Sequence, residues 1–178
     1  MPVLKLASCM AENGEPFCQH VAAYIHTRLG IETAYLNDIS WQERERLFDE
    51  DKIQILWLCG LPYVQKADLH ESDMELLAVP VPGSRRYQGR AIYFSDERIR
   101  VIETFGPSPI PPWVISRRVC EVDRERLGKL LLSMDEDPLG RSILSGGQMA
   151  RFIRASDTDY DPIRSMARAA AQITLEAL

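Results

Sequence analysis

The stretch IQILWLCGLPYV, residues 53–64, decides the predicted fold. Its apolar run, Ile53 followed by residues 55–59, is too short for a stable helix and stops at Gly60. Such a run is typical of a strand that is covered on both faces of a sheet. We therefore predict a central strand, followed by a tight turn over residues 60–63. This turn would place backbone N–H groups and one phenol at the carboxyl end of the strand, where open α/β sheets bind ligands.

Strand and helix patterns alternate before this run, which predicts a βαβαβ order with parallel strands and right-handed crossovers. The predicted elements are a strand at residues 3–8, a loop at 11–15, a helix opened by Pro16 and stopped by Gly30, a strand at 31–36, and a charged helix at 41–49 with Ser40 as a cap residue.

The pattern continues after the run with a short helical turn at residues 61–67, further strands and three helices. The predicted elements are strands at residues 74–81, 90–95 and 113–119, extended runs at 98–103 and 150–155, a helix capped by Asp123, a helix at 138–144, and a closing helix from Pro162 with Ile163, Met166, Ala167, Ala170 and Ile173 on its buried face. Together they predict an α/β three-layer sandwich with a mostly parallel central sheet.

Length and composition favour one globular domain over residues 1–178. The chain has 178 residues, of which 46% are apolar and 26% are charged. A net charge of −5 argues against a nucleic-acid partner, because a phosphate-binding face normally needs a basic surface. No apolar run is long enough to span a membrane. The first residues read as a strand and not as a secretory signal, which predicts a cytoplasmic protein, or a periplasmic one if a signal was removed.

Four segments carry a resemblance to a known family: DISWQERERLFDEDKIQILWLCGLPYV at residues 38–64, YQGRAIYFSD at 87–96, RIRVIETFGPSPIPPWVISRR at 98–118 and DYDPIRSMARAA at 159–170. They resemble the phosphate/phosphonate-type substrate-binding proteins of ABC transporters, which have a two-lobed type II periplasmic-binding-protein fold. The resemblance implies that an aromatic residue at Trp41 and a tyrosine at Tyr63 contact the ligand from the first lobe.

The sequence departs from this family at one place. Family members build a second lobe after a YFSD-like strand, whereas here Asp96 is followed at once by Glu97 and Arg98. We therefore expect a first lobe alone, with residues 1–96 joined directly to 97–178. A lone lobe should bind a small anion weakly, because the ligand stays hydrated on one side. The uncovered cleft face predicts a homodimer, either through that face or by exchange of segments around residues 96–97.

The candidate ligand-binding residues follow from the predicted strand ends and from the resemblance. They are Glu12, Asn13, Trp41, Gly60, Leu61, Pro62, Tyr63, Ser95 and Ser108. Some have a second interpretation: Trp41 could be a packing residue, Gly60 and Pro62 could only shape their loop, and Ser95 could cap a turn. An acidic Glu12 in the cleft would repel bare phosphate and favour an amine-bearing ligand.

We expect no metal and no cofactor. The four cysteines form no CxxC pair, and free thiols are the simplest interpretation. Asp157, Asp159 and Asp161 begin like a calcium loop, but Pro162 and Arg168 occupy positions that need glycine and glutamate.

The predicted function is a noncatalytic solute-binding module with weak or altered binding of a phosphate- or phosphonate-like anion. One alternative is a structural or regulatory dimeric interaction protein that has lost ligand binding. The other is an enzyme that uses a cleft carboxylate or a cysteine such as Cys9.

Overall fold

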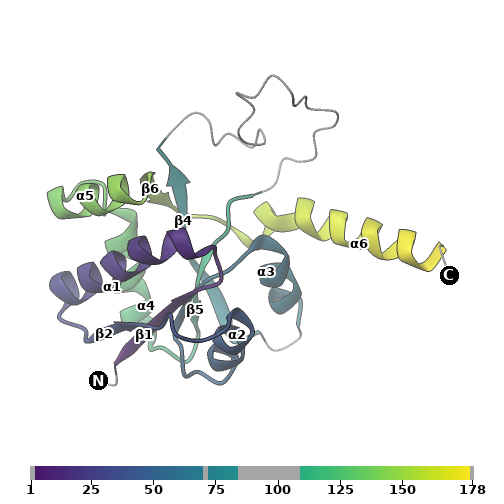
Figure 1. Cartoon of the computed structure of the whole chain (residues 1–178), viewed down its shortest axis with the longest axis horizontal. Helices are drawn as coiled ribbons and strands as arrows, with labels where there is room; N and C mark the ends of the chain where they lie inside the picture. Colours follow the sequence, from purple (N-terminus) through teal and green to yellow (C-terminus); the bar gives the residue numbers. More distant parts are fainter. Residues whose placement is uncertain (1–2, 70–71, 84–108, 177–178) are drawn as a thin grey trace.

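A computed structural model describes residues 3–69, 72–83 and 109–176 of the chain. Its centre is a six-stranded sheet in the order β2-β1-β3-β5-β4-β6 (Figure 1). The strands are β1 (Leu4–Ser8), β2 (Thr33–Tyr35), β3 (Ile55–Trp57), β4 (Met74–Pro82), β5 (Trp113–Ser116) and β6 (Met149–Ile153). The helices are η1 (Glu12–Gly14), α1 (Glu15–Leu29), α2 (Trp41–Asp49), α3 (Gly60–Ala67), α4 (Glu121–Leu132), α5 (Pro138–Gly146), η3 (Asp157–Tyr160) and α6 (Asp161–Glu176).

The sheet is mixed in its pairing. β1 pairs in parallel with both β2 and β3, whereas β5 is antiparallel to β3 and to β4, and β6 is antiparallel to β4. It follows that β1 to β4 all point one way and that β5 and β6 point the other way. The predicted α/β class is confirmed. The predicted mostly parallel sheet is correct for strand direction but not for pairing, because β5 lies between β3 and β4 and separates them.

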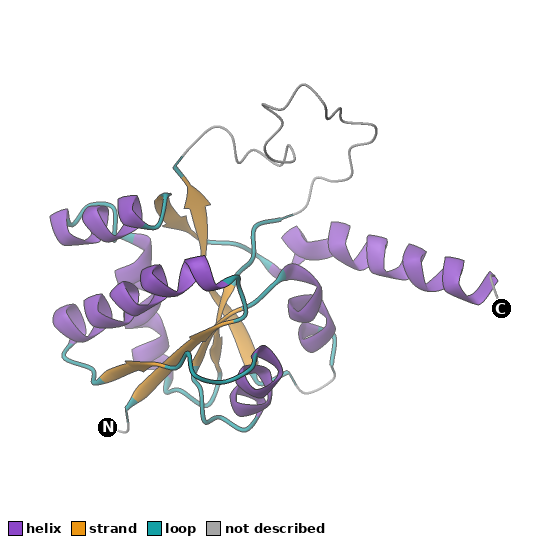
Figure 2. Cartoon of the chain, viewed as in Figure 1, coloured by secondary structure: helices purple, strands orange, loops and turns teal. Residues whose placement is uncertain are grey.

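Helices cover both faces of the sheet and give the predicted three layers (Figure 2). On one face, Ile55 and Trp57 of β3 pack with residues of α1, α4 and α5. On the other face, Leu56 and Leu58 pack with residues of α2, α3 and α6. β3 is therefore buried on both sides, which confirms the central strand predicted from its uninterrupted apolar sequence.

Three helix ends form as their sequences predict. Pro16 lies in the first turn of α1, and Gly30 ends that helix in the left-handed conformation at φ 66°. The Ser40 hydroxyl accepts a hydrogen bond from the Glu43 N–H at the start of α2. The start of α5 has a cap that the sequence analysis did not predict: the Asp137 carboxylate accepts a hydrogen bond from the Leu139 N–H.

Two predicted local structures were wrong. Residues 60–63 are the first turn of α3, not a tight turn, because the extended Cys59 takes the N-cap position and Pro62 is tolerated in a first helical turn. Asp123 does not cap α4, since that helix begins at Glu121 after Cys120. The Asp123 carboxylate instead accepts a hydrogen bond from the Cys120 thiol, 3.1 Å away.

The closing helix differs from its predicted packing. Ile163 is buried, but Met166 is 42% exposed and Ala170 is also exposed. The reason is the course of α6, which runs away from the sheet after its first turns (Figure 1). The side chain of Ile173 lies outside the described part of the chain, as do the predicted strand at residues 90–95 and the extended run at 98–103.

No helix among the described residues is long and apolar enough to cross a membrane.

Candidate functional site

Three helices begin at one edge of the sheet, where the parallel strands β1, β2 and β3 end (Figure 1). η1 and α1 follow β1, α2 follows β2, and α3 follows β3. The first N–H groups of a helix have no acceptor inside it and carry a partial positive charge. No side chain caps the first turn of α1 or α3. In α1, however, Pro16 has no N–H and the Glu15 N–H donates to the Glu12 oxygen, so the donors that this edge can offer an anion lie in the first turn of α3.

Most of the predicted site residues lie at this edge. Glu12 and Asn13 are exposed in η1. Trp41, the first residue of α2, is 56% exposed, and Leu61 in the first turn of α3 is 45% exposed. Pro62 is half-buried beside it. The structure thus brings together residues from three separate parts of the sequence.

Two predicted site residues of α3 face its neighbours η3 and α6. Tyr63 is only 3% exposed, its hydroxyl donates to Asp157 Oδ1 at 2.7 Å, and its ring centroid lies 4.5 Å from that of Tyr160. A Cβ atom on Gly60 would lie 2.2 Å from Ile163 Cδ1. Gly60 therefore permits the close packing of α3 on α6, and a ligand would have to displace Asp157 to use the Tyr63 hydroxyl.

Ser95 and Ser108, the remaining predicted site residues, lie outside the described residues.

Arg44 of α2 is a buried residue that the sequence analysis missed. Its guanidinium donates to the backbone oxygens of Ser8, Asn37 and Ile39 and to Glu15 Oε1, at distances between 2.5 and 3.0 Å. These acceptors lie at the end of β1, in the loop after β2 and at the start of α1. Arg44 therefore holds two loops of the candidate site in place. Its sequence position could have indicated burial, because Arg44 lies four residues before the apolar Phe48 and therefore on the same, inner face of α2.

A second buried arginine, Arg164, fixes the start of α6. It forms ion pairs with Asp68, Asp157 and Asp161, each between 2.8 and 3.0 Å. Burial opposes ionisation of Asp157, but the hydrogen bonds from Arg164 and Tyr63 outweigh it and lower the pKa of Asp157. Asp157 and Asp161, which mimic a calcium loop in sequence, thus serve as partners of this arginine.

Neither thiol at this edge lies in surroundings that favour its thiolate. Burial, followed by the Glu45 carboxylate, raises the pKa of Cys9 to about 12. Burial and Glu45 also raise the pKa of Cys59. A protonated thiol is a poor nucleophile, so neither cysteine is activated for catalysis. Among residues 3–69, 72–83 and 109–176, no group of three or more His, Cys, Asp or Glu side chains is placed to hold a metal ion.

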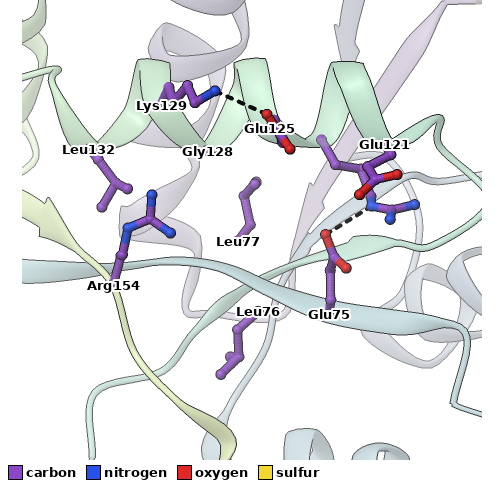
Figure 3. Close-up of a pocket in the computed structure, with 10 residues that line it drawn as sticks. Glu75, Leu76, Leu77, Glu121, Glu125, Gly128, Lys129, Leu132 and Arg154 are labelled. Carbon is purple, nitrogen blue, oxygen red and sulfur yellow. Dashed lines mark hydrogen bonds and ion pairs between the residues drawn. The ribbon is translucent and has the colours of Figure 1, made fainter.

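A separate groove of about 460 Å³ lies between β4 and α4 (Figure 3). Its charged side chains are of both signs: Glu75 accepts a hydrogen bond from Arg124 at 2.8 Å, and Lys129 donates to Glu125 at 3.0 Å. Glu75 lies near the start of β4, which points in the same direction as β1 to β3. The groove is therefore near the amino ends of these strands, away from the edge that holds Trp41.

Comparison with solved structures supports the fold. PhnD1 from Prochlorococcus marinus in complex with methylphosphonate matches with a TM-score of 0.71 and 14% identity, over 95% of this chain and 98% of that chain. A binding protein component of an ABC phosphonate transporter from Pseudomonas aeruginosa matches with a TM-score of 0.70 and 12% identity, over 92% and 84% of the two chains. A Xanthomonas citri protein bound to ATP matches with a TM-score of 0.69 and 10% identity, over 98% of each chain.

No curated protein sequence matches the chain. A family described as the phosphonate periplasmic substrate-binding proteins of ABC transporters matches residues 11–96 and 90–160. These two matches cover most of the chain, including β2 to β6 and the starts of α1, α2 and α3. The chain therefore belongs to the family of phosphonate periplasmic substrate-binding proteins of ABC transporters.

Proposed function

We propose that the protein is a noncatalytic, single-lobe binding module that takes a small phosphonate-like anion at the edge where α1, α2 and α3 begin. The observation that carries this proposal is the uncapped first turn of α3 at the same edge of the sheet as the exposed Trp41. The N–H groups would bind the anionic oxygens. Trp41 would cover the organic part of the ligand.

We further propose that binding is weak. The family match comes as two stretches that overlap at residues 90–96, the place where we expect the second lobe of the family to be missing. In two-lobed receptors, closure buries the ligand between the lobes. With one lobe, water keeps access to the ligand and weakens each electrostatic contact.

Glu12 suggests the ligand class within this proposal. Its carboxylate is exposed in η1 at the same edge and would attract an ammonium group. An aminoalkylphosphonate should therefore bind more tightly than methylphosphonate, and Glu12→Gln should reduce the difference.

Isothermal titration calorimetry tests the proposal with methylphosphonate, 2-aminoethylphosphonate and sulfate. We expect saturable binding of the phosphonates, weaker binding of sulfate, and an affinity at least about tenfold lower in Trp41→Ala, which corresponds to about 1.4 kcal/mol. Val122→Ala is the matched control, because Val122 is also an exposed apolar residue in the first turn of a helix. Absence of binding by all three anions would contradict the proposal.

The second candidate function is a dimeric interaction protein. It is favoured by exposed apolar side chains on α2, α3 and α6, namely Trp41, Leu61 and Met166. We propose that a second copy of the chain covers some of this surface, as the lone lobe predicts. Light scattering at tens of micromolar should give twice the mass of one chain. A strictly monomeric protein would contradict the dimer but leave the anion proposal standing.

We place the protein in the periplasm, the compartment of its family.

A further inference from the structure

Two of the four cysteines meet at the edge of the sheet where the helices begin. Cys9 follows β1, and its N–H donates to the Trp57 oxygen at 2.8 Å. Cys59 follows β3 after Leu58, whose N–H still pairs with the Pro112 oxygen. The Cys59 Sγ lies 3.9 Å from the Cys9 oxygen. The side chain of one cysteine therefore touches the backbone of the other.

The strand register brings the two backbones within reach of a disulfide. Ser8 pairs with Trp57 in the parallel ladder. Cys9 is the first residue after Ser8 and Cys59 is the second residue after Trp57, so the two cysteines are diagonal neighbours just past the end of the ladder. Cys59 is extended, with φ −65° and ψ 155°. Strand spacing and rise give diagonal neighbours a Cα–Cα distance of about 6 Å. Disulfides join Cα atoms roughly 4.4–6.8 Å apart.

The Cys9 sulfur lies on the side of the sheet that α2 covers, in the core layer of Leu56 and Leu58. Cys9 Sγ is 3.9 Å from the Trp41 backbone oxygen at the start of α2. The Cys59 sulfur approaches Cys9 from the neighbouring strand end, through its contact with the Cys9 oxygen.

The other two cysteines are separate from this pair. Cys18 is buried in the opposite core layer, between α1 and the sheet. Cys120 precedes α4, after the end of β5. Because β5 runs opposite to β1 and β3, this end lies at the far edge of the sheet.

We propose that Cys9 and Cys59 are a redox modification site that forms an intramolecular disulfide under oxidising conditions. At alkaline pH the exposed Cys59 loses its proton to solvent and its thiolate attacks an external disulfide, such as oxidised glutathione, which releases one thiol and leaves a mixed disulfide on Cys59. Cys9 then loses its proton and attacks the Cys59 sulfur, which releases the second thiol. In balance, two protein thiols are oxidised and one external disulfide is reduced to two thiols.

The disulfide would connect the end of β1 directly to the start of α3. Between these cysteines lie η1, α1, β2, α2 and β3, so the bond would close a loop that contains Glu12, Asn13 and Trp41 of the candidate site. Such a closed loop reduces the freedom of the unfolded chain and raises stability. This inference rests on the positions of the sulfurs and does not require the proposed anion binding.

The test incubates the folded, reduced chain with oxidised glutathione and then alkylates the remaining thiols in denaturant for mass spectrometry. We expect loss of two of the four thiols, no glutathione adduct, no covalent dimer, and a melting temperature several degrees higher than that of the reduced chain. Cleavage after Glu12 separates Cys9 from Cys18, which share one tryptic peptide.

Two variants assign the bond. Cys59→Ser should keep all of its thiols or retain one glutathione as a mixed disulfide, whereas Cys120→Ser should still lose two thiols. Circular dichroism verifies that both variants are folded. Four thiols remaining after oxidation, a stable glutathione adduct on Cys59 of the unsubstituted chain, or a bond through Cys18, Cys120 or a second chain would each overturn the proposal.

Discussion

At the scale of single residues, two arginines organise the side of the sheet that carries the candidate site. Arg44 binds the loops after β1 and β2, and Arg164 binds the start of α6 to the end of α3. Buried charges are costly unless they are paired and hydrogen-bonded. Each guanidinium meets this requirement with several oxygen acceptors.

Replacing Arg44 with methionine should lower the free energy of unfolding by about 3 kcal/mol. The substitution leaves buried oxygens of Ser8 and Asn37 without a donor and Glu15 without its cation. Arg46→Met on the same helix is the control, because Arg46 forms only exposed pairs, which contribute about 0.5 kcal/mol each. Urea unfolding measures both. Equal losses in the two variants would show that the buried position of Arg44 has no special role.

Asp137 should make the protein sensitive to acid. The hydrogen bonds from Arg28 lower the pKa of Asp137 to about 2, and hydrogen bonds from the Tyr24 hydroxyl and the Leu139 N–H contribute smaller decreases. In the unfolded chain this pKa is about 4. The charged carboxylate therefore stabilises the fold above pH 4, and this contribution is lost as the pH falls toward 2.

Asp137→Asn should therefore be less stable than the unsubstituted chain at pH 7 and equally stable near pH 2, because asparagine keeps the helix cap but not the charge. Unfolding midpoints between pH 7 and 2 test this. Asp38→Asn is the control, since Asp38 makes no ion pair within the described residues. A constant difference between Asp137→Asn and the unsubstituted chain at all pH values would contradict the assignment.

At the scale of elements, the start of α6 packs directly on α3. This contact combines the close approach at Gly60, the Tyr63 to Asp157 hydrogen bond and the Tyr63–Tyr160 ring pair. The helix that carries the uncapped N–H groups is therefore held by the helix that leaves the domain body (Figure 1).

Gly60→Ala should destabilise the protein by about 1–2 kcal/mol. The added methyl group would overlap Ile163 Cδ1 at 2.2 Å. Gly146→Ala at the end of α5 should be close to neutral, because nothing lies within 4 Å of its added Cβ. In a double-mutant cycle, Ile163→Ala should cost less in the Gly60→Ala background than alone. Additive losses would show that the two positions do not touch.

Local patterns predicted some elements well and others poorly. The central strand and the ends of α1 follow from an unbroken apolar run and from Pro16 and Gly30, which act locally. The position of β5 between β3 and β4 depends on long-range pairing, which residue patterns do not encode. The exposure of Met166 was missed for the same reason, because an apolar stripe does not reveal whether its helix meets a partner.

Part of the candidate site could be predicted from the sequence. Exposed residues at strand ends, such as Glu12 and Trp41, follow from the rule that ligands bind at the carboxyl edge. The inward packing of Tyr63 could not be predicted from local patterns, because its partners Asp157 and Tyr160 are about a hundred residues away in sequence.

At the scale of the whole molecule, membership in a phosphonate-binding family and a lone predicted lobe have opposite consequences. The first supplies an edge with helix N-termini, and the second leaves that edge open to water. A groove on the other side, next to Arg154 between β4 and α4, offers a competing place for an anion (Figure 3). The proposed function requires that the anion bind at the edge beside Trp41 and not in this groove.

Amide NMR of the ¹⁵N-labelled chain, titrated with 2-aminoethylphosphonate, tests this choice most directly. We predict saturable chemical-shift changes that are largest at the N–H groups of Gly60 and Leu61 and at the Trp41 indole. Shifts that are absent, or that cluster at Arg154 and Lys129 instead, would contradict it.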